Sequence, residues 1–84
     1  MNLKSNLSDY TERDFIAFIN AILNAGTEDE RGTMVEHFNL IVPHPAGSDL
    51  LYYPESGADD SPEGVTATIK VWCAAHGVPG FKAG

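Results

Sequence analysis

The sequence contains almost no cysteine, few basic residues and no long apolar run. Cys73 is the single cysteine among 84 residues, which excludes an internal disulfide and a zinc cluster built on several thiolates. No apolar stretch approaches the ~18 residues that a membrane span requires, and residues 1–5 lack the apolar core of a signal peptide. We therefore expect one cytoplasmic domain, residues 1–84, stabilised by packing alone.

The shortage of basic residues is concentrated in one part of the chain. Five lysines and arginines oppose twelve acids, so the net charge is −7. Residues 28–63 hold nine acids and only Arg31, a local charge of −8. Such a field repels nucleic acids and membrane surfaces and speeds the encounter with a basic partner. Taken alone, this charge fits a merely solvated surface better than a binding site.

A first amphipathic helix is predicted over residues 12–24. Thr11–Asp14 resembles a capping box, and four apolar residues follow at helical spacing: Phe15, Phe18, Ile19 and Ile22. The helix should end at Ala25–Gly26, because glycine suits the left-handed conformation past a helix end.

A second helix is predicted over residues 28–42. Thr27–Glu30 reads as a full capping box, and Pro43 forbids continuation. The core stripe consists of three apolar residues: Met34, Phe38 and Ile41. Gly32 lies inside this helix at a cost of about 0.5–1 kcal/mol relative to alanine, and we favour simple tolerance over close approach of a neighbour.

The second half of the chain predicts one short and one long helix. One to two turns fit between Gly47 and Pro54, with Ser48 as a plausible cap, and residues 55–60 form an acidic loop. A cap and a first-turn proline at Ser61–Pro62 begin a helix that Gly77 ends, and Phe81 is free to fold back on the core. The absence of an alternating strand pattern makes the fold class all-α, an antiparallel four-helix bundle.

Catalytic and metal-binding patterns are weak. Cys73 and His76 are three residues apart on a helix, but neither an orienting third group nor an oxyanion site accompanies them. The three histidines form no helical ligand pair, so we interpret them as solvent-facing or hydrogen-bonded. We expect a binding protein that is not an enzyme, with no cofactor, no metal and no small-molecule substrate.

An acyl or peptidyl carrier is the alternative class, because such carriers are also small acidic helical bundles. Their phosphopantetheine arm would be attached to Ser48 in the Gly47–Leu50 stretch. Carriers have the order Asp-Ser-Leu, whereas Ser48 here precedes Asp49. The serine also follows the second long helix instead of preceding it.

Motifs along the whole chain together resemble the immunity proteins of DNase-type colicins and pyocins. The most specific stretch is Gly47–Leu50 followed by Tyr52–Pro54. The others are Leu3-Lys4, Ser8–Glu12, Phe15, His44-Pro45, Asp59–Pro62, Gly64, Trp72 and Gly80–Lys82. The resemblance implies a distorted four-helix bundle with a short third helix. It also implies that the chain forms a heterodimer with the basic nuclease domain of a bacteriocin, beside the active site, and excludes DNA by bulk and charge.

In that family the short third helix supplies contacts common to many partners. The resemblance assigns this shared anchor to Ser48, Asp49, Tyr52, Tyr53 and Pro54. Adjacent tyrosines are typical of interface hot spots because they present large amphipathic rings at low entropy cost. Core packing is the alternative for the tyrosines, but both are hard to bury on a short helix, so at least one should be exposed.

In the same family the second helix sets partner choice. A face separate from the core stripe, the specificity face, consists of Glu28, Gly32, Val35 and Asn39, which lie at i, i+4, i+7 and i+11. Val35 fits a binding contact and a helix-edge packing residue equally well. Arg31 and Glu36 are candidate rim charges.

Two departures from the enteric colicin members stand out. The turn between the first two helices is shorter, and Arg31-Gly32 replaces residues that tend to be apolar. We therefore expect a pyocin-like or other DNase as the cognate toxin.

Overall fold

The computed structural model describes residues 4–52 and 61–83. In chain order the elements are η1 (Leu7–Asp9), α1 (Glu12–Leu23), α2 (Glu28–Ile41), α3 (Asp49–Tyr52) and α4 (Pro62–His76). The all-helical fold with a short third helix is confirmed for these residues. The short 3-10 helix η1 was not predicted. Tyr53, Pro54 and the predicted acidic loop lie outside the described residues.

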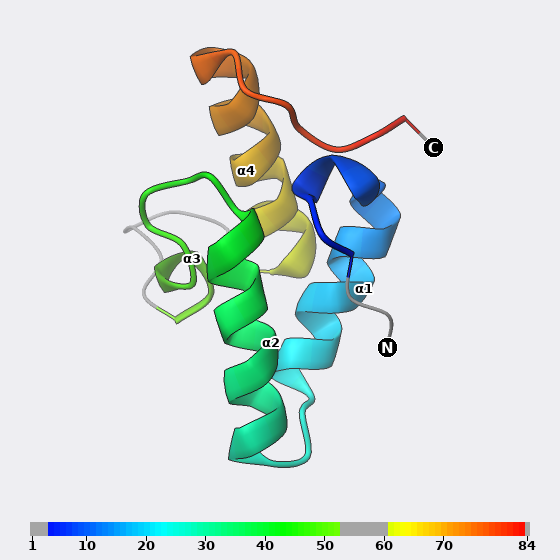
Figure 1. The fold of residues 1–84 in the computed structure, drawn as a ribbon, viewed down its shortest axis with the longest axis vertical. Helices are drawn as coiled ribbons and strands as arrows, with labels where there is room; N and C mark the ends of the chain where they lie inside the picture. The colour runs from blue at the N-terminus through cyan, green and yellow to red at the C-terminus, as the bar shows by residue number, and fades with distance from the viewer. Residues whose placement is uncertain (1–3, 53–60, 84) are drawn as a thin grey trace.

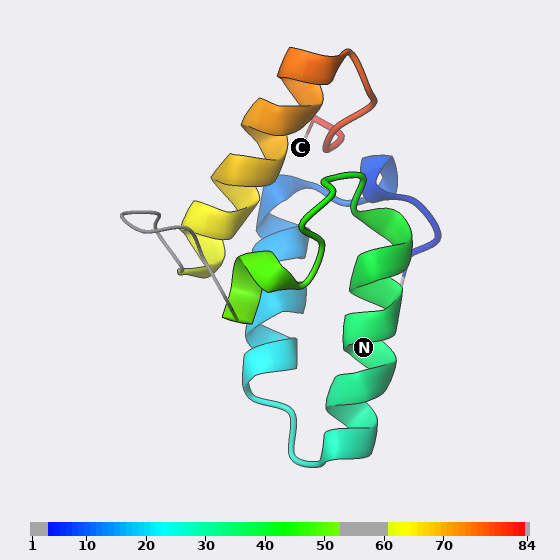
Figure 2. The same ribbon diagram turned by 90° about the vertical axis from the view of Figure 1, so that its left-hand side faces the viewer.

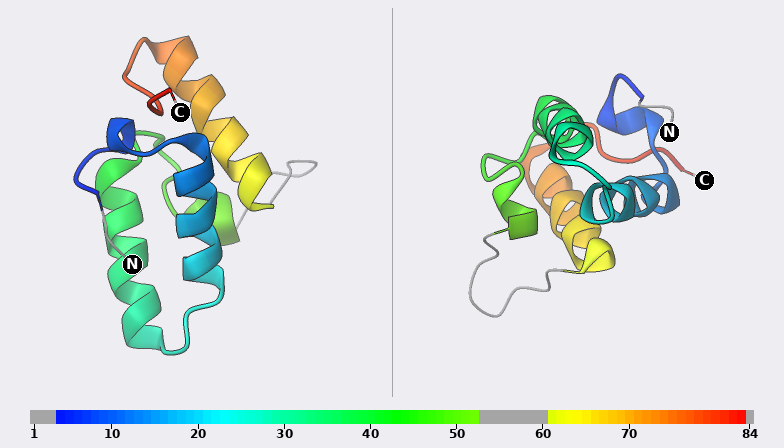
Figure 3. Two further views of the ribbon diagram at one scale, coloured as in Figure 1. Left: turned by 90° about the vertical axis from the view of Figure 1, so that its right-hand side faces the viewer. Right: turned by 90° about the horizontal axis from the view of Figure 1, so that it is seen from below.

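The long helices surround one interior. α1 and α2 run antiparallel and side by side, and α1 also packs against α4 (Figure 1). α3 lies on the outside of this arrangement, between α2 and α4, in two perpendicular views (Figures 2 and 3). None of the helices in residues 4–52 and 61–83 is long and apolar enough to cross a membrane.

Local signals set most helix ends as predicted. The Asp14 backbone N–H donates to the Thr11 hydroxyl at 3.0 Å, and the Thr11 backbone N–H donates to the Asp14 carboxylate at 3.4 Å. This capping box lowers the pKa of Asp14 below its ordinary 3.8, chiefly through the hydrogen bond from the Thr11 backbone. In α4, Ser61 accepts from the Gly64 N–H, and Gly77 has the left-handed φ of 65°. These caps are confirmed.

The turn between α1 and α2 corrects two predictions. Gly26 is not left-handed: in the described residues only Gly47 and Gly77 have positive φ. Asn24 is the C-cap instead: its side-chain amide donates to the Asn20 carbonyl at 2.8 Å, and the next backbone N–H, that of Ala25, donates to the Ile22 carbonyl at 3.3 Å. Thr27 accepts from the Glu30 N–H at 3.1 Å, but the Glu30 carboxylate reaches past the cap to the Gly26 N–H at 3.3 Å. The predicted full capping box is therefore wrong in its second half.

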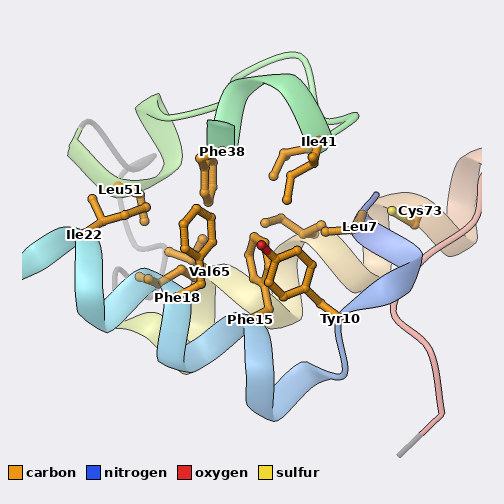
Figure 4. Close-up of a cluster of buried hydrophobic side chains, with 13 residues drawn as sticks. Leu7, Tyr10, Phe15, Phe18, Ile22, Phe38, Ile41, Leu51, Val65 and Cys73 are labelled. Atoms are coloured by element: carbon orange, nitrogen blue, oxygen red, sulfur yellow. The ribbon is translucent and has the colours of Figure 1, made fainter. Parts of the chain in front are cut away.

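The core is aromatic at its centre. The Phe15 ring lies 5.6 Å from the Phe38 ring and 5.8 Å from the Phe18 ring, measured between centroids. η1 adds Leu7, and Tyr10 follows it directly into the core. α4 adds Val65, Ile69 and Cys73, and Leu51 of α3 points into the interior (Figure 4). The predicted return of Phe81 is confirmed, since its ring lies 5.1 Å from that of Phe15.

Candidate partner-binding surface

The outer side of α2 carries acids that have no basic partner within the described chain. Thr27 caps the helix, and Glu28, Asp29 and Glu30 lie in its first turn, where the helix dipole stabilises carboxylates. Within residues 4–52 and 61–83 the only ion pair joins Lys70 to Glu12, 3.2 Å apart, on α4 and α1. The acids of α2 thus form no ion pair, and the helix keeps a net negative charge because it holds four acids against Arg31 alone.

The specificity face is exposed at three of its four positions. Glu28, Gly32 and Asn39 are exposed, as are the predicted rim charges Arg31 and Glu36. A Cβ added to Gly32 would meet no atom within 4 Å. Tolerance of this glycine, not close approach of a neighbour, is therefore confirmed.

Val35 is partly buried. It packs against the core cluster together with Met34. The helix-edge interpretation of Val35 is therefore correct for the free protein. Its remaining exposed surface lies on the same helix as the acids and can still contact a partner.

α3 is divided into an inner and an outer side. Leu51 is 9% exposed and Leu50 is half-buried against the core. Asp49 is exposed and Tyr52 is 43% exposed, so the prediction of at least one exposed tyrosine is confirmed. Because the leucines fix the inner side, the aspartate and the tyrosine ring are presented outward.

The connection between α2 and α3 brings two predicted site residues together. The Ser48 backbone N–H donates to the Asn39 side-chain oxygen at 2.8 Å, and the Asn39 amide nitrogen donates to the Ser48 hydroxyl at 3.3 Å. The sequence predicts Asn39 in the specificity face and Ser48 in the anchor, and nine positions separate them. No local sequence signal indicates such a contact.

The histidines have structural partners. The His37 Nε2 lies 2.7 Å from the Lys4 carbonyl oxygen, and the His44 Nδ1 accepts from the Ala46 N–H at 3.0 Å. His76 is exposed and stacks on Trp72, with 4.1 Å between ring centroids. These contacts confirm that the histidines are hydrogen-bonded or solvent-facing.

Cys73 is 2% exposed, and burial raises the pKa of its thiol. A raised pKa disfavours the reactive thiolate. In residues 4–52 and 61–83 no group of three or more histidine, cysteine or acidic side chains could hold a metal ion.

The exposure of one apolar side chain on α2 was not predicted from the sequence. Leu40 is 79% exposed and follows Asn39 directly. Its exposure could have been predicted from its position, because Leu40 is out of phase with the core stripe that contains Phe38 and Ile41. A single exposed leucine is common on protein surfaces, so its exposure assigns it no role.

Residues 7–75 match a known family, described as colicin immunity protein / pyocin immunity protein. This chain belongs to that family. The pyocin-S1 and pyocin-S2 immunity proteins of Pseudomonas aeruginosa are each 44% identical to it over 87 residues. Each alignment covers 98% of this chain and 100% of the relative.

Solved structures of such proteins share the fold. The crystal structure of the pyocin AP41 DNase–immunity complex contains a chain that matches with a TM-score of 0.87 and 36% identity, over 100% of this chain and 98% of that one. The crystal structure of the mutant nuclease domain of pyocin S8 with its cognate immunity protein also contains a matching chain. Its TM-score is 0.84 and its identity is 41%, and the match covers 95% of this chain and 100% of that one. The predicted resemblance is confirmed, and none of these relatives supports the carrier alternative for Ser48.

Proposed function

We propose that this protein binds the basic nuclease domain of a DNase-type bacteriocin, forming a heterodimer beside the active site and blocking access of DNA. The observation that carries the proposal is the full-length likeness to immunity proteins solved in complexes with pyocin nuclease domains. The protein would therefore act as an inhibitor and not as an enzyme. Its place would be the cytoplasm, where the producing cell's own DNA needs protection.

The charge of the surface supports a basic partner. The acids on α2 have no ion-pair partner in the described chain, so their field reaches solvent and steers a positively charged domain toward this side. The same charge repels DNA, which carries one negative charge per roughly 1.7 Å of helix axis. A bound immunity protein would thus exclude the substrate by repulsion as well as by volume.

We propose a division of the surface into anchor and specificity parts. The anchor consists of Ser48, Asp49, Tyr52, Tyr53 and Pro54, and exposed Tyr52 supports it by offering a large ring at low entropy cost. The specificity part consists of Glu28, Arg31, Gly32, Val35 and Glu36 on α2. Asn39 lies on the same face, but its side chain is hydrogen-bonded to Ser48 of the anchor.

The test is titration of the purified protein into DNA-cleavage assays with several bacteriocin nucleases. The panel holds the nuclease domains of pyocins S1, S2, AP41 and S8, with a ribonuclease-type bacteriocin domain as the negative control. We expect complete inhibition of at least one DNase at one equivalent and none of the ribonuclease. Cleavage that persists for every DNase at large excess would falsify the proposal.

A further inference from the structure

The side chain of Asn39 uses both ends of its carboxamide to hold the chain that leads into α3. Its oxygen accepts from the Ser48 backbone N–H at 2.8 Å, and its nitrogen donates to the Ser48 hydroxyl at 3.3 Å. We call these two bonds the Asn39–Ser48 clamp. They link the last turns of α2 to the residue just before α3, two segments that the backbone connects through a separate turn (Figure 2).

Gly47 fits this clamp for two reasons. Its φ of +51° lies in the left-handed region that favours glycine. A Cβ at Gly47 would also collide with the Asn39 side-chain oxygen. The residue before Ser48 therefore needs glycine both for its backbone conformation and for the close approach of Asn39.

α3 needs external support because it has only four residues, Asp49–Tyr52. Helices shorter than about 12–15 residues are marginal in isolation. On its inner side Leu51 is buried in the core. At its start, the three N–H groups of Asp49, Leu50 and Leu51 donate to the carbonyls of Ala46, Gly47 and Ser48. The Ser48 N–H has its partner in Asn39, so the clamp completes the hydrogen bonding of this turn.

We propose that the Asn39–Ser48 clamp holds α3 in its binding orientation before the partner arrives. Asn39 is then a positioning residue for the anchor and not a direct selector among partners. This inference rests on the proposed function for its effect on affinity, but the clamp itself can be tested in the free protein. A surface already ordered loses less entropy on binding, so the clamp raises affinity for every partner alike.

The matched variants are Asn39→Ala, which removes both bonds, and Asn39→Asp, which keeps an acceptor for the Ser48 N–H and can accept from the Ser48 hydroxyl. Leu40→Ala is the control, because it truncates a neighbouring α2 side chain that is 79% exposed and belongs to neither the anchor nor the specificity part. Asn39 is itself exposed, so we expect all three variants to fold. Circular dichroism checks this.

Amide hydrogen exchange of the free protein is the first measurement. In Asn39→Ala we expect at least tenfold faster exchange at Ser48, Leu50 and Leu51, with protection largely restored in Asn39→Asp and unchanged from the native protein in Leu40→Ala. Unchanged exchange in Asn39→Ala would overturn the clamp. This outcome is independent of any nuclease, so failure of the clamp and failure of the proposed function can be told apart.

Affinity for two inhibited nuclease domains is the second measurement. The clamp changes affinity only through the cost of ordering α3 on binding, so we expect less than the full worth of its two hydrogen bonds: a loss of about tenfold for Asn39→Ala, or ~1.4 kcal/mol. This loss should be equal for both nucleases and mostly recovered in Asn39→Asp. A loss confined to one nuclease would instead make Asn39 a direct specificity contact and overturn its positioning role.

Discussion

Replacing Tyr52 by alanine should remove a large part of the binding energy. An aromatic side chain buries roughly 150–250 Å² when fully covered, and Tyr52 is 43% exposed. A partner that covers this exposed fraction would bury about 65–110 Å² of the Tyr52 side chain. At about 25 cal/mol per Å² this corresponds to roughly 2 kcal/mol, or about a 30-fold weaker complex, the range of an interface hot spot.

Isothermal titration calorimetry with a nuclease domain inhibited by the native protein measures this loss. Tyr52→Phe keeps the ring and should lose much less affinity than Tyr52→Ala. Val71→Ala is the control, because Val71 is 68% exposed on α4, a helix to which the proposal assigns no contacts. Equal losses for Tyr52→Ala and Val71→Ala, or no loss for Tyr52→Ala, would refute the reasoning.

Three further predictions concern stability and selectivity. Gly32→Ala should raise the unfolding free energy by about 0.5–1 kcal/mol, because alanine favours helix and the site is open, which thermal unfolding would show as a higher midpoint. The folded-state pKa of Asp14 is lowered, so its stabilisation is present above pH 3.8 and is lost as pH falls through the folded value. In urea unfolding, the native protein should therefore have a higher unfolding free energy than Asp14→Asn at pH 7. This difference should shrink as the pH falls through the folded-state pKa of Asp14. Val35→Ala should change the ranking of nuclease affinities in calorimetry, whereas an equal loss for all would place Val35 outside the specificity part.

Much of the fold follows from local sequence signals. The Thr11 capping box, the Ser61 cap and the left-handed Gly77 depend on residues within four positions of each other, so the sequence alone predicts them. The turn after α1 was predicted wrongly at Gly26 and at Glu30. The Glu30 carboxylate has two backbone N–H groups within reach, those of Thr27 and Gly26, and sequence spacing does not decide which of them donates to it.

The candidate surface divides in the same way. The exposure of Tyr52 could be predicted, because a four-residue helix that buries Leu51 cannot bury every large side chain. The packing of Val35 against the core could not be predicted, because helical spacing places this side chain at the boundary between the core-facing and the solvent-facing side of α2. The bonds of Asn39 to Ser48 depend on how the chain turns after α2. That turn is a property of the tertiary structure.

The proposed binding surface is tested most directly by a hydrogen-exchange footprint of this protein with and without the nuclease domain that it inhibits best. We expect added protection on α2 and α3, including Leu51 and the amide of Tyr52, with little change on the exposed side of α4. Protection confined to α4 and the outer side of α1, with α2 and α3 unchanged, would contradict the proposal.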